Sequence, residues 1–301
     1  MITYSAIGAN KRNSALLIMI FLILIIGLGY VFSRFYCQPG ILLLAVGFSV
    51  VSSFFSYYFS DSITLAMSHA QQITRQSSPE LFRIVENLTI TAGLPLPRIY
   101  IIEDTAINAF ATGRDPEHAV VCATTGALTR LNKAELEGVI AHELSHVGNY
   151  DIRYMTIVVV LVGTLTLIAD WFLRIGFFGG RKKGSDDNNG NQIFFIIGIV
   201  LAILSPIIAT LIQLAVSRQR EYLADASGAL ITRYPEGLAS ALEKIAQDTE
   251  PLEAANKATA HLYIANPFKE GSKNGASWFS GLFNTHPPVE ERIKRLREMN
   301  L

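Results

Sequence analysis

Long apolar runs alternate with stretches of ordinary polarity along this chain of 301 residues. A helix needs about 20 consecutive apolar residues to cross the hydrocarbon core of a bilayer. Four runs approach or exceed that length, at residues 15–33, 41–59, 155–175 and 193–216. We therefore predict four transmembrane helices, arranged as two hairpins over residues 15–59 and 155–216. For the second hairpin the alternative is a buried helical pair of a soluble core, but the lengths of the two runs favour spanning.

The first run follows a short polar tail, residues 1–14, which carries Lys11 and Arg12. A basic flank before an apolar run is also typical of a cleaved signal peptide. This run is longer than the usual apolar region of such a peptide, however, and no small-residue cleavage site follows it. We therefore predict a retained membrane anchor.

The segments outside the hairpins have the patterns of a folded domain. In residues 61–150, positions 62–73 continue a helical pattern, and three short apolar stretches separated by turn residues predict buried strands. These strands are expected at residues 99–102, 106–112 and 119–123. Residues 217–301 have mainly helical patterns. The prediction is one α+β domain that is split in the sequence by the second hairpin.

A helix is predicted after the third strand, because Asn132 and Glu135 have the spacing of a capping box. It carries the motif His142-Glu143-x-x-His146. Positions i and i+4 lie on one helix face, so both imidazoles can bind a single zinc ion. Glu143 lies about 100° further round, where it can reach a water molecule on the metal. Five residues can match this motif by chance, so the rest of the chain must support it.

Composition agrees with a membrane protein and narrows the possible partners. Charged residues make up 17% of the chain, against about 25% in ordinary soluble domains. The 25 basic and 25 acidic residues give a formal net charge of zero, so no nucleic-acid partner is expected. The two cysteines, Cys37 and Cys122, fall on opposite sides of the predicted membrane. We therefore expect neither a disulfide framework nor a cysteine zinc site.

A catalytic zinc site usually has a third protein ligand besides the two histidines. The candidates include many acids and four further histidines: His69, His118, His261 and His286. Glu221 stands out because Asp225 follows one turn later on the same helix face. One carboxylate can then bind the metal while the other orients a ligand imidazole. Against this interpretation, such pairs often form a solvated face, and Arg218 could simply pair with Glu221.

Several separated motifs in this order resemble the HtpX family of membrane zinc endopeptidases, whose relatives include the CAAX prenyl protease family. The motifs are His142-Glu143-x-x-His146, Glu221-Tyr222-x-Ala224-Asp225, Thr285-His286-Pro287-Pro288 followed by Arg292, and Asn108-Ala109-Phe110-Ala111-Thr112-Gly113. The resemblance covers essentially the whole chain, including the order of apolar runs and motifs. No catalytic position departs from the family pattern.

The resemblance implies a membrane-bound endopeptidase with one Zn²⁺ per chain, held by His142, His146 and Glu221. Glu143 would be the catalytic residue, hydrolysing peptide bonds through a zinc-activated water. Asp225 would orient a ligand imidazole. The fold implied is a mainly α membrane protein with four transmembrane helices and an α+β zincin-like catalytic domain with a small sheet.

Two further residues are expected near the substrate. Asn108 belongs to a strand that can pair with an extended peptide, although it could also lie in an ordinary turn. His286 could stabilise the oxyanion of the reaction, but a histidine before two prolines is at least as often structural. We interpret His69, His118 and His261 as structural or surface residues.

Topology follows from the need for His142 and Glu221 to meet, which requires the second hairpin to cross the membrane an even number of times. Basic residues before the first run and after the second favour a cytoplasmic N-terminus and catalytic domain in the plasma (inner) membrane. The loop Arg181-Lys182-Lys183 argues against this orientation.

Membrane or misfolded proteins, in quality control, are the expected substrates. A processing protease for a specific, lipidated substrate is the nearest alternative. An intramembrane protease fits poorly because the motif helix carries Lys133, Glu135 and Glu137. A membrane scaffold without enzymatic activity is much less favoured.

Overall fold

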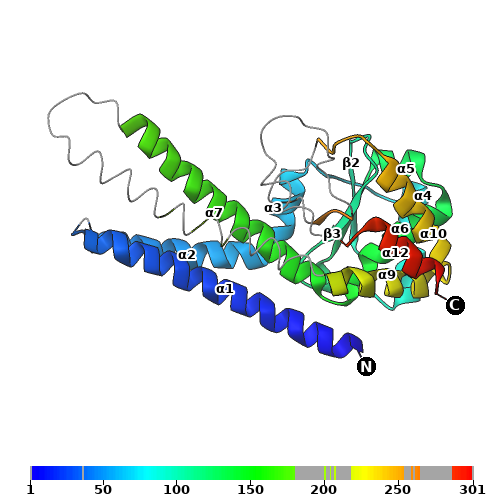
Figure 1. Ribbon diagram of the computed structural model, residues 1–301, viewed down its shortest axis with the longest axis horizontal. Helices are drawn as coiled ribbons and strands as arrows, with labels where there is room; N and C mark the ends of the chain where they lie inside the picture. Colours follow the sequence, from blue (N-terminus) through cyan, green and yellow to red (C-terminus); the bar gives the residue numbers. More distant parts are fainter. Residues whose placement is uncertain are drawn as a thin grey trace.

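The computed structural model describes residues 2–35, 37–179, 200, 204, 207, 218–253, 259, 262–264 and 287–299. Within these residues the protein is mainly helical with a small mixed sheet. Figure 1 shows long helices extending to one side of a domain that contains the sheet and the shorter helices. The predicted class is therefore confirmed in its coarse form.

In the part of the chain that the structure describes, three helices are long and apolar enough to cross a membrane: α1 (Ile2–Phe35), α2 (Gly40–Tyr58) and α7 (Asp151–Gly179). α1 packs against both α2 and α7, and their apolar side chains form one buried cluster. Of the predicted fourth run, residues 193–216, only Val200, Leu204 and Ile207 are described, and all three pack into this cluster. The rest of that run lies outside the described residues.

α1 begins at Ile2, well before the apolar run at residues 15–33. The polar residues 2–14 are therefore the first turns of the same helix. In Figure 1 the N-terminal end of α1 lies beside the domain with the sheet, and the α1–α2 connection lies at the far end of the long helices. This placement brings the first residues of the chain close to the candidate site.

The sheet has four strands in the order β1-β2-β4-β3. β2 (Arg98–Ile102) and β4 (Val120–Thr124) are parallel, with Ile99 opposite Val121, and β3 (Ala109–Thr112) pairs antiparallel with β4. These are the three strands predicted from the sequence. β3 and β4 are buried along their whole length, whereas β2 starts at the exposed Arg98 and is only partly buried at Tyr100 and Ile101.

The helix predicted over residues 62–73 is wrong in its second half. α3 (Ser60–Met67) ends at Met67, and β1 (Gln71–Gln72) follows as an edge strand antiparallel to β2. His69 has a φ of 52°, which is incompatible with a continuing right-handed helix. Two exposed glutamines carry no hydrophobic pattern, so this strand cannot be predicted from local patterns.

Helix α6 (Lys133–Gly148) lies at the centre of the domain. Its N-terminus has the predicted capping box: the Asn132 side chain accepts from Glu135 N–H, and the Glu135 carboxylate accepts from Asn132 N–H. Twelve of its sixteen residues are buried, including His142, Glu143 and His146 of the motif. A helix enclosed on all sides must satisfy its polar groups within the protein.

The helices around α6 come from both sides of the apolar runs at residues 155–216. α4 (Pro79–Ala92) precedes these runs, whereas α9 (Arg218–Thr232) and α10 (Pro235–Gln247) follow them, and all three pack against α6. α12 (Val289–Arg297) packs on α9 and α10. Their apolar faces share one core with the inner faces of β2, β3 and β4.

Candidate metal centre

Helix α6 presents His142 and His146 on one face, with their Nε2 atoms 3.2 Å apart. The two rings are perpendicular to each other, with centroids 4.8 Å apart. Both side chains are almost completely buried, as is Glu143 between them in the sequence. The i,i+4 spacing therefore brings the two imidazoles together as predicted.

Helix α9 brings Glu221 to the same point. Its carboxylate oxygens lie 3.7 Å from His142 Nε2 and 3.7 Å from His146 Nε2. The ligand atoms of His142, His146 and Glu221 all lie within 4.8 Å of one another. Glu221 is 1% exposed, so it belongs neither to a solvated face nor to a surface pair with Arg218.

The close approach of α9 to α6 depends on Gly228. A Cβ atom at this position would lie 2.9 Å from the backbone nitrogen of His142, closer than real Cβ contacts. Gly228 therefore lets α9 pack directly against the backbone of the motif helix. Glu221 lies two turns earlier on α9 and is positioned by this contact.

These three side chains fit a zinc ion. In a tetrahedral centre with Zn–N bonds of about 2.0–2.1 Å, two ligand nitrogens lie roughly 3.3 Å apart. The observed 3.2 Å between the Nε2 atoms agrees with that value. Two imidazoles and one carboxylate are also a usual protein donor set for catalytic zinc.

Each imidazole is held through its Nδ1 atom by an aspartate. His142 Nδ1 lies 3.0 Å from Asp225 Oδ1, and His146 Nδ1 lies 3.0 Å from Asp151 Oδ2. A carboxylate at Nδ1 keeps the proton on that nitrogen and leaves Nε2 free to bind a metal. Asp151 therefore makes a hydrogen bond to His146, whereas Asp225 lies against His142 Nδ1 without a well-aligned hydrogen bond.

Both aspartates are held in turn by arginines. Arg292 of α12 binds Asp225 in a bidentate manner, with Nε and Nη2 2.8 and 2.7 Å from the two carboxylate oxygens. It also donates to the carbonyl of Ile264. Arg220 Nε lies 2.9 Å from Asp151 Oδ1. Such charge-assisted pairs fix the carboxylates and therefore the imidazoles.

The charges at the centre also favour a divalent cation. Four buried carboxylates lie here, from Glu143, Asp151, Glu221 and Asp225. With both imidazoles neutral, as metal ligands are, the two arginines that face the carboxylates among the described residues compensate half of the charge of the ionised groups. A dication would balance the remainder. Uncompensated charge is expensive to bury, so the composition of this cluster suits a metal ion.

Burial raises the pKa of the Glu143 carboxyl to about 7, and the neighbouring charge of Glu221 adds to the rise. His146 and a hydrogen bond from the backbone N–H of Ala111 act in the opposite direction. A carboxyl with this pKa can accept and return a proton near neutral pH, as a general base requires.

Burial alone would lower the pKa of His146, but the hydrogen bond to Asp151 and the charge of Glu221 outweigh it and raise the pKa to about 9. Burial has the opposite effect on a carboxyl and would raise the pKa of Asp225, but the charge and hydrogen bonds of Arg292 lower it to about 2. Asp225 is therefore ionised over the whole physiological range and remains an acceptor for the imidazole.

Local patterns in the sequence predict no role for Asp151 or Arg220, and Arg292 enters only through the resemblance. Asp151 lies shortly after Gly148 and Asn149, residue types that often end a helix, and an acidic residue there can fold back on a histidine five positions earlier. Arg292 is far away in the sequence, and only the docking of α12 on α9 reveals its contact.

The predicted substrate strand lies beside the motif helix. Asn108 is buried just before β3, where its backbone N–H donates to Thr124 Oγ1 and its side chain accepts from Ala109 N–H. β3 is an edge strand of the sheet, and Ile264 N–H donates to the carbonyl of Ala109 on its outer side. The edge is therefore partly covered.

Of the remaining histidines, the two that lie among the described residues, His69 and His118, do not join the cluster. His69 is at the end of α3, and His118 pairs with Asp115 on the surface. His261 and the predicted oxyanion residue His286 lie outside the described residues.

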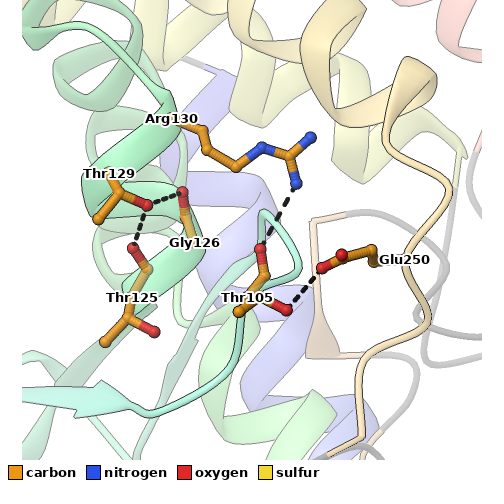
Figure 2. Close-up of a pocket in the computed structure, with 6 residues that line it drawn as sticks. All are labelled: Thr105, Thr125, Gly126, Thr129, Arg130 and Glu250. Atoms are coloured by element: carbon orange, nitrogen blue, oxygen red, sulfur yellow. Dashed lines mark hydrogen bonds between the residues drawn. The ribbon is translucent and has the colours of Figure 1, made fainter.

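A separate open cavity of about 380 Å³ lies beside α5 (Thr125–Arg130) and is shown in Figure 2. It is lined by Thr105, Thr125, Gly126, Thr129, Arg130 and Glu250. The Thr105 hydroxyl donates to Glu250, and Thr129 donates to backbone carbonyls of its own helix. None of these residues belongs to the metal cluster. At this cavity, hydrogen bonds from Thr105 to Glu250 and from Arg130 to the Thr105 carbonyl hold the loop that precedes Asn108.

Comparison with known proteins gives the family of the chain. The model of peptidase family M48 matches residues 75–300. The chain belongs to peptidase family M48. The matched region contains His142, Glu143, His146 and Glu221 together with their aspartate and arginine partners.

Relatives of this M48 peptidase include the "Protease HtpX homolog" of Tropheryma whipplei strain Twist, 49% identical over 98% of both chains. The protein of the same name from Dictyoglomus turgidum is 45% identical over 98% of this chain and 94% of its own. The crystal structure of S. mikatae Ste24p aligns with a TM-score of 0.47 and 18% identity, covering 89% of this chain and 61% of that one. The resemblance to the HtpX family is thereby confirmed, and the chain is a membrane-bound metalloprotease.

Proposed function

We propose that this M48 peptidase is a zinc-dependent endopeptidase with one Zn²⁺ per chain. His142, His146 and Glu221 are its ligands, and Glu143 is its catalytic residue. The observation that carries the proposal is the convergence of two Nε2 atoms and a carboxylate in a buried cluster, with each imidazole held by an aspartate. That arrangement prepares the nitrogens for a metal and has no other evident use in the core of the domain.

In the proposed reaction, bound zinc supplies Lewis-acid activation of a water molecule and of the scissile carbonyl. Glu143 accepts the proton from the attacking water and returns it to the leaving amine. Its raised pKa, about 7, suits both transfers. Asp225 and Asp151 hold the imidazoles in one tautomer during the reaction, and Arg292 and Arg220 hold the aspartates.

The strand β3 is the proposed substrate platform. An extended peptide can add to its outer edge, where affinity comes from main-chain hydrogen bonds. The Ala111 N–H on this strand donates to the Glu143 carboxylate. A substrate carbonyl that took this N–H would release Glu143 for its work on the water. Asn108, just before the strand, would fix the position of the peptide. The oxyanion role of His286 stays a prediction.

We further propose that the catalytic domain combines residues 61–150 and 217–301, with hairpins at 15–59 and 155–216 that span the plasma (inner) membrane. The catalytic domain faces the cytoplasm and acts on membrane or misfolded proteins in quality control. Lys11, Arg12 and Arg75, which flank the first two apolar runs, support this orientation. The contacts of α9 and α10 with α6 support the two-part domain.

Glu143→Gln tests the catalytic assignment. We expect the purified variant to bind one zinc per chain, as the wild type does, and to lose about 10²–10⁴-fold in cleavage of casein, the range for removal of a general base. Glu137→Gln is the matched control, because it makes the same change on the same helix at a residue that pairs only with Lys133. Equal cleavage by wild type and Glu143→Gln, or wild type without stoichiometric zinc, would contradict the proposal.

The third ligand is tested separately. Glu221→Ala is expected to lose zinc, whereas Asp225→Ala should weaken binding less, about 10–100-fold, because Asp225 acts through His142. The measurement is zinc content after dialysis against a chelator of graded strength. If Glu221→Ala retained the wild-type affinity, the third ligand would have to be another residue.

A further inference from the structure

Asn10 is a buried amide on the first membrane helix, α1, and its side chain reaches the candidate metal centre. Its Nδ2 atom donates to the carbonyl of Asn149, at 3.0 Å, and to Asp151 Oδ1, at 2.6 Å. Asn149 and Asp151 lie where α6 ends and α7 begins. The contact joins residues about 140 positions apart and is made by a helix with the length and composition of a membrane span.

Asp151 connects Asn10 to a proposed zinc ligand. One of its oxygens, Oδ2, lies 3.0 Å from His146 Nδ1, while the other, Oδ1, accepts from Asn10. The intervening Tyr150 has a φ of 59°, so the chain turns sharply here and returns the carboxylate toward His146. The position of the Asp151 carboxylate therefore decides the orientation of the His146 ring.

The two histidine–aspartate pairs differ in how the aspartate is held. Asp225 is bound by two nitrogens of Arg292. Asp151 Oδ1 lies 2.9 Å from Arg220 Nε, and the same oxygen accepts a hydrogen bond from Asn10. Arg220 Nη2 also approaches Asn10 Oδ1, at 3.5 Å. The carboxylate of Asp151 is therefore held by an arginine together with an amide from the first membrane helix.

We propose that Asn10 is a positioning residue of the metal centre, through which the first membrane helix fixes Asp151 and, through it, His146. This inference rests on the proposed function, because it takes His146 as a zinc ligand. On this proposal α1 is a part of the catalytic unit as well as a membrane anchor. Displacing the start of α1 from the α6–α7 junction would then weaken zinc binding without touching any ligand.

The experiment compares zinc affinity in Asn10→Leu, Asn10→Gln and wild type, each as the full chain in detergent. Leucine has the same branching and the same number of side-chain heavy atoms as asparagine and suits a membrane helix, so it removes the hydrogen bonds with a side chain of similar shape and somewhat larger volume. We expect Asn10→Leu to weaken zinc binding about tenfold, the low end for outer partners of a ligand. Asn10→Gln keeps the amide and should stay closer to wild type. The Co²⁺-substituted protein should show a changed d–d spectrum in Asn10→Leu.

Ser14→Ala is the matched control. Ser14 is buried one turn further along the same helix, and its hydroxyl donates to the Asn10 carbonyl within the helix. It should bind zinc as the wild type does. A purely structural role of α1 would instead give Asn10→Leu the zinc affinity and cobalt spectrum of the wild type, and this result would overturn the inference.

A double-mutant cycle with Asp151→Asn separates positioning from misfolding. If Asn10 acts through Asp151, the Asn10→Leu effect on zinc affinity should largely disappear in the Asp151→Asn background. If the two effects add, Asn10 does not act through Asp151 and the inference is wrong. Wild type without stoichiometric zinc would refute the proposed function and this inference together. Zinc-binding wild type with unaffected Asn10 variants would refute only the inference.

Discussion

Two histidines on one helix become a metal site only if their rings are held in one orientation, and in this protein that task falls to Asp151 and Asp225. Each aspartate contacts one Nδ1 atom at 3.0 Å. The helix spacing of His142 and His146 could be predicted because it depends on local geometry alone. Asp225 could be predicted because it lies one turn from Glu221. The contacts of Asp151 and Arg292 could not be derived in this way, since they depend on the turn at Tyr150 and on the docking of α12.

A pH dependence follows at this scale from Glu143. Burial raises the pKa of its carboxyl to about 7, and the base must be ionised to accept a proton from water. Activity should therefore rise with pH and be lost as Glu143 becomes protonated. The positive charge of a bound metal acts in the opposite direction and lowers this pKa. We therefore expect the acid limb of the kcat/KM profile at or below about pH 7. An acid limb centred well above pH 7 would contradict the assignment of Glu143 as the base.

At the scale of elements, the centre depends on how closely α9 approaches α6. The strands β2, β3 and β4, the capping box of α6 and the order of helices could be predicted from local patterns. The packing of α9 against α6 could only be inferred from the need for His142 and Glu221 to meet. Gly228 makes this packing possible, because the absence of a side chain leaves room for the backbone of His142. The sequence contains this glycine, but it does not indicate that the backbone of His142 packs against it.

Gly228→Ala tests this packing. The added Cβ atom would lie 2.9 Å from His142 N, so the helices must separate and Glu221 must move away from the histidines. We expect zinc affinity to fall about tenfold or more, comparable to the loss of an outer partner of a ligand. Alanine favours a helix by about 1 kcal/mol over glycine, so the loss would not come from helix propensity.

Gly148→Ala is the control for Gly228→Ala. A Cβ atom at Gly148 would meet only the Leu94 side chain, at 3.7 Å, which is an ordinary contact. This variant should keep the zinc affinity of the wild type. Equal affinities in all three proteins, measured by competition with a chelating dye, would show that the α6–α9 contact does not set the position of Glu221.

At the scale of the whole molecule, apolar helices and the catalytic domain form one unit. α1 and α7 both reach the domain, and Asn10 and Asp151 meet at its edge. Apolar length was sufficient to predict α1, α2 and α7 as candidate spans. The extension of α1 back to Ile2 could not be predicted from apolar length, because its first turns are polar and are placed by packing on the domain.

Cys37 provides a test of the proposed orientation. It is exposed in the connection between α1 and α2, whereas Cys122, the other cysteine of the chain, is buried in β4. With a cytoplasmic catalytic domain, Cys37 lies on the outer side of the membrane. A membrane-impermeant maleimide added to intact cells should then label this protein at Cys37. The Cys37→Ser variant should not be labelled. Labelling of Cys37 only after the cells are permeabilised would reverse the orientation.

The central claim is that one zinc ion joins the two parts of the domain at His142, His146 and Glu221. Anomalous X-ray scattering at the zinc edge from crystals of the purified protein tests it most directly. We predict one zinc peak per chain, about 2.0–2.2 Å from both Nε2 atoms and from a Glu221 oxygen. A zinc ion that lies beyond bonding distance of Glu221, or the absence of any zinc peak between the two histidines, would contradict the account.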